Sequence, residues 1–457
     1  MSEIAFIPAD NRPVCFQLPR LVTAQAKEHN LYLPDIEFMG SLTKASNTDE
    51  IFNWLKELKN IDIYIISLDT IAYGGLISSR RTNDGIEKII NRINEFFEII
   101  QNTKSKNAKV FAFSSIMRIS DNNINEEEKS YWAYWGKKIF EYSYNFHKKG
   151  IFKTDIPKEI LHDYLDTRKR NFEVNKYYME LKKQGLIDFL VFSKDDCAKF
   201  GLNVLEAKEL EMLSRGLNNV FIKTGADEIP LVLLSNALNK EKKIKIYPFY
   251  LYPFSIDRIS RYEDITVKQA VENQIELSGG IVSTEENFDM MLIVNNFKRE
   301  QGELVMDIKV PLFDGSLNIG DKPYFIADIL NANGGDNNFV SKLLSKNLEN
   351  FYGYAAWNTT SNTLGSVISG ALTYYKAEKP DKSAFNELQT VRFLDDWAYQ
   401  ANVRNKIRDN ILNLSPEILK NKMKEYEKII ISKFPIKKEI LYYFPWNRFF
   451  EIGVLLK

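Results

Sequence analysis

Cysteine and histidine are both scarce in this chain. Among its 457 residues there are two cysteines, Cys15 and Cys197, and three histidines, His29, His147 and His162. Two thiols exclude a framework of several disulfides and a zinc site with four cysteine ligands. Three histidines argue against a histidine-rich metal centre. Carboxylates are then the remaining metal ligands, and they suit hard cations such as Mg²⁺ or Mn²⁺.

An excess of one charge and a long apolar run are also missing. Lysine and arginine together number 61, as do aspartate and glutamate, which argues against nucleic acid or an anionic membrane as partner. No run of about 18 apolar residues occurs, and "MSEIAFIPADNRP" at the N-terminus lacks the regions of a signal peptide. We expect a cytoplasmic protein whose partner is a small molecule or an oligosaccharide. A homo-oligomer stays open.

The usual nucleotide-binding fingerprints are absent too. The "YGG" at 73–75 allows a tight loop or a close backbone approach, but it is not a G-x-G-x-x-G pattern. The chain also has no Walker A motif. We therefore expect no nucleotide cofactor, and no cofactor at all unless Mg²⁺ or Mn²⁺ is bound.

Short apolar runs alternate with longer amphipathic ones along the chain, which is typical of a parallel sheet with helical crossovers. Helices are predicted at 47–60, 83–102 and 165–185. The predicted strands are 4–9, 36–40, 61–68, 109–116, 187–193, 219–224, 243–251, 290–296, 323–330 and 351–357.

The predicted fold class is α/β. We favour a (β/α)₈-like barrel with a helical C-terminal extension, and the alternative is a set of doubly wound, Rossmann-like lobes. The helix–strand–turn–strand pattern of 270–296 favours the alternative. Three parts are expected: a barrel-like α/β domain at 1–240, an α/β continuation or second lobe at 241–380, and a mainly helical cap at 381–457.

Polar motifs follow the predicted strands instead of being scattered. Because the carboxyl ends of parallel strands face one way, loops that follow them converge on one crevice or barrel mouth. We therefore expect one site for a substrate. Its predicted residues are Asp10, Arg12, Asp69, Tyr73, Arg80, Arg118, Asp195, Asp196, Asp227, Glu228, Asn333, Trp357 and Asn358.

Several of these residues have a structural alternative. Asp10 fits a turn cap as well as a ligand contact, and Asp227 or Glu228 fits the cap of the following helix. Arg80 fits either a fork around a substrate or an exposed position. Trp357 fits either a stacking floor for a sugar ring or a core position. The segments 392–404 and 444–451 favour packing and interhelical salt bridges.

The motif "SKDDC" holds two adjacent aspartates, Asp195 and Asp196, directly after an apolar strand. Repulsion between neighbouring carboxylates raises one pKa, which suits a pair in which one group is an acid and the other stays charged. The alternatives are metal ligation and a cap for the following helix. We favour the catalytic or substrate-binding pair.

Taken in order, these motifs resemble one family, the bacterial domain of unknown function family 4127 (DUF4127). The resemblance covers almost the whole chain and departs at Asn11, where the family pattern has a second aspartate. It implies that the loops form one unit but implies no reaction. The motifs that carry it are "IPADNRPV", "ISLDTIAYGGLISSR", "IMRIS", "DFLVFSKDDCAKFG", "GADE", "DILNANGGD", "GYAAWNTTSNTLG" and "PWNRFFE".

The sequence therefore favours a hydrolase that acts on a carbohydrate, in the manner of a glycoside hydrolase. Asp195 and Asp196 are the expected acid/base pair, and the other strand-end residues would hold the sugar. A second hypothesis is a Mg²⁺- or Mn²⁺-dependent hydrolase that uses Asp10, Asp69, Asp195, Asp196 and Asp227 as ligands. A third is a sugar-binding protein without catalytic activity.

Overall fold

The computed structural model describes residues 1–150, 153–195, 197–238, 243–317, 319–408 and 416–457. The chain divides into two compact units. Unit 1 comprises Met1–Asn11 and Asn30–Pro230, and unit 2 comprises Arg12–His29 and Leu231–Lys457. The three-part division that we predicted at residues 240 and 380 stays a prediction.

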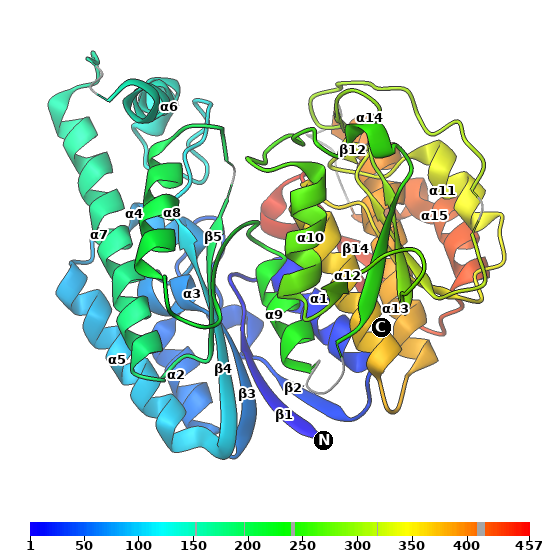
Figure 1. The fold of residues 1–457 in the computed structure, drawn as a ribbon, viewed down its shortest axis with the longest axis horizontal. Helices are drawn as coiled ribbons and strands as arrows, with labels where there is room; N and C mark the ends of the chain where they lie inside the picture. The colour runs from blue at the N-terminus through cyan, green and yellow to red at the C-terminus, as the bar shows by residue number, and fades with distance from the viewer. Residues whose placement is uncertain (151–152, 196, 239–242, 318, 409–415) are drawn as a thin grey trace. The chain divides into compact units, whose positions relative to one another are not determined.

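Unit 1 contains a six-stranded sheet with the order β2-β1-β3-β4-β5-β6, in which β1, β3, β4, β5 and β6 pair in parallel (Figure 1). The strands are β1 (Ser2–Ile7), β2 (His29–Tyr32), β3 (Ile61–Ser67), β4 (Lys104–Ile116), β5 (Phe189–Lys194) and β6 (Val220–Thr224). The helices are α2 (Thr48–Glu57), α3 (Leu68–Tyr73), α4 (Leu76–Arg81), α5 (Ile86–Thr103), α6 (Trp132–Lys149), α7 (Lys158–Lys183) and α8 (Leu202–Leu213).

Local sequence accounts for most of these elements. The central strands β3 and β5 are almost entirely buried, as expected for apolar runs covered on both faces. Helix α2 begins where Asn47 accepts a hydrogen bond from the backbone N–H of Glu50. The strand predicted at 36–40 is wrong. Asp35 caps a short 3₁₀ turn there, and the strand of this region is β2, earlier in the chain.

Unit 2 contains a second parallel sheet with the order β13-β11-β9-β7-β8. Its strands are β7 (Lys245–Tyr250), β8 (Ile281–Val282), β9 (Met290–Asn295), β11 (Tyr324–Asp328) and β13 (Phe351–Ala355). Two smaller pairs accompany it: β10 (Gly302–Glu303) with β12 (Asn331–Ala332), which are parallel, and β14 (Ile440–Tyr443) with β15 (Gly453–Leu456), which are antiparallel.

Helices surround this second sheet and dominate the C-terminal part. Helix α9 (Ile229–Leu238) runs from the end of unit 1 into unit 2. The helices of unit 2 include α1 (Pro13–Ala24), α10 (Val267–Leu277), α11 (Asn337–Leu344), α12 (Thr360–Lys376), α13 (Lys382–Arg392), the π-helix η3 (Phe393–Val403), α14 (Arg404–Arg408) and α15 (Pro416–Lys433).

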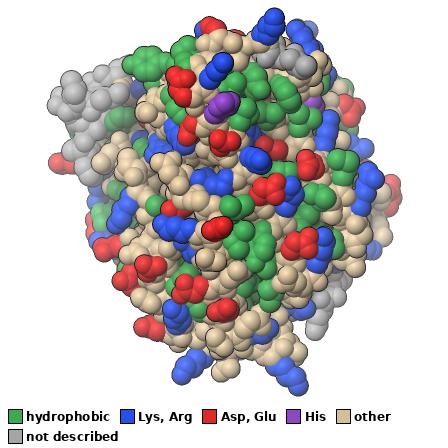
Figure 2. All heavy atoms as spheres, turned by 90° about the vertical axis from the view of Figure 1, so that its left-hand side faces the viewer, with side chains coloured by type: hydrophobic (Ala, Val, Ile, Leu, Met, Phe, Trp, Pro, Cys, Tyr) green, Lys and Arg blue, Asp and Glu red, His purple; other side chains and the backbone are tan. Residues whose placement is uncertain are grey.

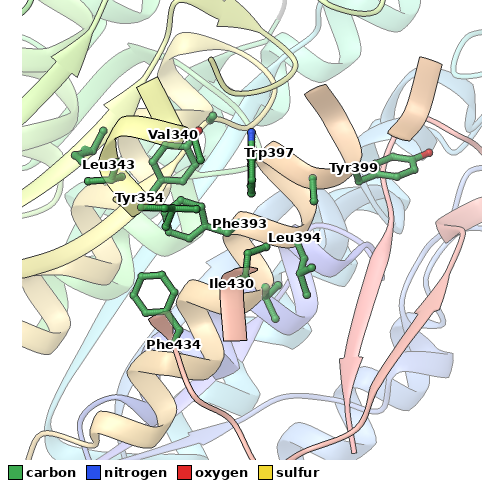
Figure 3. Packing of buried hydrophobic residues seen from close by; sticks show 14 of the residues in the cluster. Val340, Leu343, Tyr354, Phe393, Leu394, Trp397, Tyr399, Ile430 and Phe434 are labelled. Atoms are coloured by element: carbon green, nitrogen blue, oxygen red, sulfur yellow. The ribbon is translucent and has the colours of Figure 1, made fainter. Parts of the chain in front are cut away.

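The core of unit 2 is rich in aromatic rings (Figure 3). Phe393 is fully buried, and its ring stacks on Tyr354 with centroids 4.5 Å apart and on Phe434 with centroids 5.4 Å apart. These rings come from η3, β13 and the residue after α15, so the cluster joins the C-terminal helices to the sheet. Stacked contacts of this kind add to the free energy of burial.

The predicted α/β class, with parallel strands, helical crossovers and a helical C-terminal region, is confirmed. The barrel that we favoured is not supported: apart from the two small pairs, the described strands form two separate parallel sheets, each with its own edge strands. That is the arrangement of the doubly wound alternative. In both sheets the carboxyl ends of the strands still face one way.

The hydropathy of the helices and the charge of the surface agree with the composition of the chain. Among the described residues, no helix is both long and apolar enough to cross a membrane. On the face shown in Figure 2, acidic and basic side chains are interspersed, and neither sign gathers into a continuous region. This mixture agrees with the balanced composition of the chain.

Candidate active site

Asp69 lies directly after β3, at the start of α3, and its side chain is buried. Its Oδ2 atom accepts a hydrogen bond from the backbone N–H of Ser115 on β4, 2.8 Å away. The Oγ atom of Ser193 on β5 lies 3.3 Å from that of Ser115. Three adjacent strands therefore contribute polar groups to one point at their carboxyl ends.

Burial determines the charge state of this cluster. It raises the pKa of Asp69 to about 6, against hydrogen bonds from Ser115 and the charge of Arg80, which lower it. Burial, and then the charge of Asp69, raises the pKa of Tyr73 well above its ordinary value. Asp69 is thus a carboxyl group that changes protonation near neutral pH, while Tyr73 stays neutral.

Arg80 and Arg118 share two glutamates in the loop after β4. Glu128 lies 3.2 Å from Nε of Arg80 and 3.1 Å from Nε of Arg118. Glu127 lies 3.6 Å from Nη2 of Arg80 and 2.8 Å from Nη2 of Arg118. Arg118 also places its Nη1 atom 3.6 Å from Oδ2 of Asp195. The predicted residues Arg118 and Asp195 are therefore brought together.

Sequence reasoning missed both of these glutamates. They belong to "NEEEK", a charged run in a loop, where a solvent-exposed position is the ordinary expectation. Instead Glu128 is buried, because the two guanidinium groups compensate its charge. The guanidinium of Arg80, which is 2% exposed on its side chain, is likewise engaged by this chain's own carboxylates.

Asp10 and Asp227 are two predicted carboxylates that lie close together although they are far apart in the sequence. Asp10 follows β1 and Asp227 follows β6, and they are 6% and 7% exposed. A carboxylate oxygen of one lies within 4.8 Å of a carboxylate oxygen of the other. Strands β3, β4 and β5 lie between β1 and β6 in the sheet, so the loops reach across its edge to bring the two side chains together.

Local contacts hold both loops in this position. The hydroxyl of Thr70 donates a hydrogen bond to the carbonyl of Pro8, 2.7 Å away, and ties the loop of Asp10 to α3. Glu228 folds back to accept a hydrogen bond from the N–H of Ala226 at 2.9 Å. A Cβ atom at Gly225, where φ is +132°, would lie 1.8 Å from the Glu228 carboxylate. The loop of Asp227 therefore requires a glycine here.

The adjacent aspartates of "SKDDC" are only partly described, because Asp196 lies outside the described residues. The capping alternative is wrong for Asp195, since α8 begins at Leu202. The first N–H groups of α8 are satisfied by residues of α6: that of Gly201 donates to Nδ1 of His147 at 3.0 Å, and that of Leu202 to Oγ of Ser143 at 2.8 Å.

This cap predicts a pH dependence. Nδ1 of His147 accepts a hydrogen bond only while the ring is unprotonated, and burial, then the charge of Lys208, lowers the His147 pKa. The contribution of His147 to stability is therefore complete above about pH 6.5 and is lost as pH falls through the lowered pKa of the folded state.

We expect His147→Asn, which keeps an acceptor but does not titrate, to reduce the loss of unfolding free energy between pH 7.5 and pH 5 by up to about 1 kcal/mol. Chemical denaturation at both pH values measures this difference. The variant His162→Asn serves as the control. Equal pH dependence in His147→Asn and the wild type would contradict the assignment.

Four of the predicted residues belong to unit 2, beginning with Arg12. Arg12 is the residue before α1, it is buried, and its guanidinium lies 4.9 Å from the ring centroid of Trp446. Arg448 lies 4.7 Å from the same ring. The segment 444–451, which we interpreted as packing, thus contributes an aromatic ring to two guanidinium groups.

Asn333 and Asn358 are also brought together. The N–H of Asn333 donates to the carbonyl of Asn358 at 2.9 Å, and its side chain donates to Glu303 at 2.6 Å. Both residues have positive φ, 63° and 55°, a conformation that asparagine tolerates. Trp357 is 1% exposed and packs in the core, so the prediction of a stacking floor for a sugar is not supported.

Unit 2 also buries a carboxylate network that sequence reasoning did not place in a site. Asp328 accepts hydrogen bonds from Asn295 at 2.8 Å and from Tyr354 at 3.0 Å, and burial followed by the charge of Asp336 raises its pKa to about 7. The sequence gives one sign of this network, the aspartate pair of "LDDW" (394–397) within an otherwise apolar helix.

The two aspartates of this motif, Asp395 and Asp396, lie within η3. Arg392 lies 2.9 Å from Asp395 and 3.0 Å from Asp396. We predicted salt bridges between helices for this segment, but these two lie along one helical segment. Burial raises the pKa of Asp396 to about 7 against the charge of Arg392. Asp396 also accepts a hydrogen bond from the N–H of Ala356 at 2.7 Å. We assign this network to the stability of unit 2.

Fold and site together define a two-unit α/β protein whose first unit gathers buried carboxylates at the carboxyl ends of a parallel sheet. The model of the family described as "Protein of unknown function (DUF4127)" matches residues 4–455. The chain belongs to this family, as the resemblance of its motifs predicted. No curated protein and no solved structure matches the chain.

Proposed function

We propose that the chain is a hydrolase acting on a carbohydrate, in the manner of a glycoside hydrolase, with Asp10 and Asp227 as its pair of carboxyl groups. The proposal is carried by the separation of their carboxylate oxygens, which is within 4.8 Å. Retaining glycoside hydrolases hold two carboxyl groups about 5–5.5 Å apart, whereas inverting enzymes need about 6.5–9.5 Å to admit a water. The two groups are closer than the inverting range, so retention is the outcome we propose.

In this mechanism one carboxylate attacks the anomeric carbon while the other carboxyl group protonates the leaving oxygen. The glycosidic bond breaks, and the sugar is esterified to the first aspartate. Water then attacks the anomeric carbon, and the second group, now ionised, takes its proton. The sugar leaves with its original anomeric configuration, and both carboxyl groups return to their starting states.

Asp195 takes a supporting role in this proposal. The sequence alone favours Asp195 and Asp196 for the acid/base chemistry, and we propose Asp10 and Asp227 instead because their carboxylate oxygens lie within 4.8 Å of each other. Arg118 holds Asp195 as an oriented carboxylate, which suits hydrogen bonding to sugar hydroxyls or stabilisation of positive charge in the transition state.

The same separation favours a second candidate, a Mg²⁺- or Mn²⁺-dependent hydrolase. Two buried carboxylates this close can offer oxygen ligands to a single cation. Asp10 and Asp227 would be the ligands, since hard divalent cations prefer carboxylate oxygens. The metal would polarise the substrate or activate a water.

A screen for hydrolysis separates these candidates. Purified protein would be incubated with aryl glycosides of the common sugars, with and without prior chelation, and its metal content would be measured. We expect turnover that survives complete metal removal and products that keep the anomeric configuration. Turnover that returns only with Mg²⁺ or Mn²⁺ would replace the first candidate by the second. Sugar binding without any turnover would contradict both and favour the non-catalytic alternative.

A further inference from the structure

A cavity of about 350 Å³ lies in unit 1 and is lined in part by α3 and α4. Its walls are the loop 42–46, the first residue of α2, the end of α3, helix α4 and the side chain of Arg92 on α5. The volume is within the range of about 300–1,000 Å³ that is common for small-molecule sites. Neither Asp10, Asp69, Asp195 nor Asp227 is among the residues that line it.

The shape of this cavity depends on two glycines. Gly74 ends α3 with a φ of +84°, and a Cβ atom there would lie 2.8 Å from the Cβ of Ala45. A Cβ atom at Gly40 would lie 2.7 Å from the carbonyl oxygen of Gly74. The backbone N–H of Ser46 donates to that same carbonyl at 2.8 Å. The "YGG" motif therefore provides the close backbone approach that its sequence predicted, and it places the loop over the cavity.

The lining carries more positive than negative charge. Lys44, Arg81 and Arg92 line the cavity, and Asp84 is the carboxylate among the lining residues. Arg92 lies 2.9 Å from Asp84, so these two charges offset each other. Lys44 is exposed at the rim.

The charge of Arg81 is held mainly by backbone groups. Its guanidinium donates to the carbonyls of Leu42 at 2.7 Å, Glu128 at 3.0 Å, Asn125 at 3.3 Å and Glu126, which carry no net charge. The carboxylates of Glu127 and Glu128 form their ion pairs with Arg80 and Arg118. Because Arg92 and Asp84 offset each other, a small ligand in the cavity would meet the positive charges of Lys44 and Arg81, that of Arg81 being offset in part by Glu127 and Glu128.

Hydroxyl groups form the remaining polar surface of the cavity. Thr43, Thr48, Ser78 and Thr82 line it. Hydroxyls act as both donors and acceptors, as the hydroxyl groups of a sugar do. Hydroxyl groups together with positive charge suit a ligand that is rich in hydroxyl groups and has an anionic group.

We propose that this cavity binds a small polyhydroxylated anion, either a sugar phosphate or a uronic acid. Lys44 and Arg81 recognise the anionic group, and the hydroxyls of α4 and the flanking loops recognise the sugar. The inference does not depend on the proposed hydrolase, because the cavity and the carboxylate pair have no residue in common. Binding at the cavity and turnover at the pair are therefore measured separately.

Calorimetric titration of the full chain tests this site. The probes are glucose 6-phosphate, glucuronate, glucose and inorganic phosphate. We expect at least one anionic sugar to bind at least tenfold more tightly than glucose. Tighter binding of glucose 6-phosphate identifies a phosphate site, and tighter binding of glucuronate identifies a carboxylate site. No binding by either anionic sugar at millimolar concentration overturns the proposal.

Matched variants locate the binding. Lys44→Glu reverses an exposed charge at the rim and is expected to weaken anion binding about tenfold, which corresponds to about 1.4 kcal/mol. The control Lys59→Glu changes an exposed lysine of the same unit that does not line the cavity. Ser78→Phe fills the cavity and is expected to abolish binding. Wild-type affinity in Lys44→Glu overturns the assignment, whether or not Ser78→Phe folds.

Discussion

Asparagine in place of Asp10 or Asp227 is expected to lower turnover of a glycoside by about 10²–10⁴-fold, the usual contribution of a positioned acid or base. Asparagine has nearly the shape of aspartate but can neither donate a proton as an acid nor attack as a carboxylate. Both side chains are buried and lie within 4.8 Å of each other through their carboxylate oxygens, so each loss removes one half of a pair.

The two variants are expected to differ with the leaving group. A substrate whose leaving group needs no protonation, such as a dinitrophenyl glycoside, should restore the first step in the variant that lacks the acid. It should not restore the variant that lacks the nucleophile. This comparison assigns the two roles, which the structure leaves symmetric.

Asp121→Asn is the control for these measurements, because Asp121 is an exposed aspartate in unit 1 that follows the same end of a strand. Circular dichroism and melting temperature should show that all three variants are folded. If Asp10→Asn and Asp227→Asn both keep the turnover of Asp121→Asn, the carboxylate pair is not the catalytic pair. If turnover falls only with loss of bound metal, the metal-dependent candidate takes its place.

The largest expected change in stability is that of Phe393→Ala, at about 3–5 kcal/mol. Phe393 is fully buried, and its ring is parallel to that of Tyr354 within 8°, with centroids 4.5 Å apart (Figure 3). The rings of Phe434 and Phe351 also approach it, with centroids 5.4 Å and 6.4 Å away. Removal of the ring leaves a cavity among side chains from several helices and strands, which can collapse only in part.

Scanning calorimetry of the whole chain measures this effect. Phe254→Ala is the matched control, because Phe254 is 72% exposed and its removal should change stability by no more than about 0.5 kcal/mol. Phe393→Leu should lie between the two, since leucine refills part of the space. A transition for Phe393→Ala that matches the control would show that this aromatic cluster does not determine the stability of unit 2.

Much of the fold could be predicted because its signals are local. The apolar runs that became β3, β5 and β11 are short and almost wholly buried, and buried parallel strands require such runs. The cap of α2 at Asn47 depends on a residue three positions away. The error at 36–40 has a local cause as well, because Asp35 bonds to the N–H of Glu37 and turns the chain.

The candidate site could be predicted only as a set of residues. That Asp10 and Asp69 follow strands is visible in the sequence, and parallel strands bring such residues to one edge. The sequence does not show which of these residues contact one another. The cap of α8 illustrates this, since its partners His147 and Ser143 are more than fifty residues away and were not predicted. Burial of Glu128 likewise depends on two arginines from other loops.

The sequence by itself determined the α/β class, the polar ends of the strands and membership of the family, because periodicity and motif order are properties of neighbouring residues. Only the tertiary structure decided that the strands form two parallel sheets, that Trp357 is core, and that Asp10 approaches Asp227. Those outcomes depend on which distant segments pack together, and the packing free energy of such contacts is not contained in any one segment.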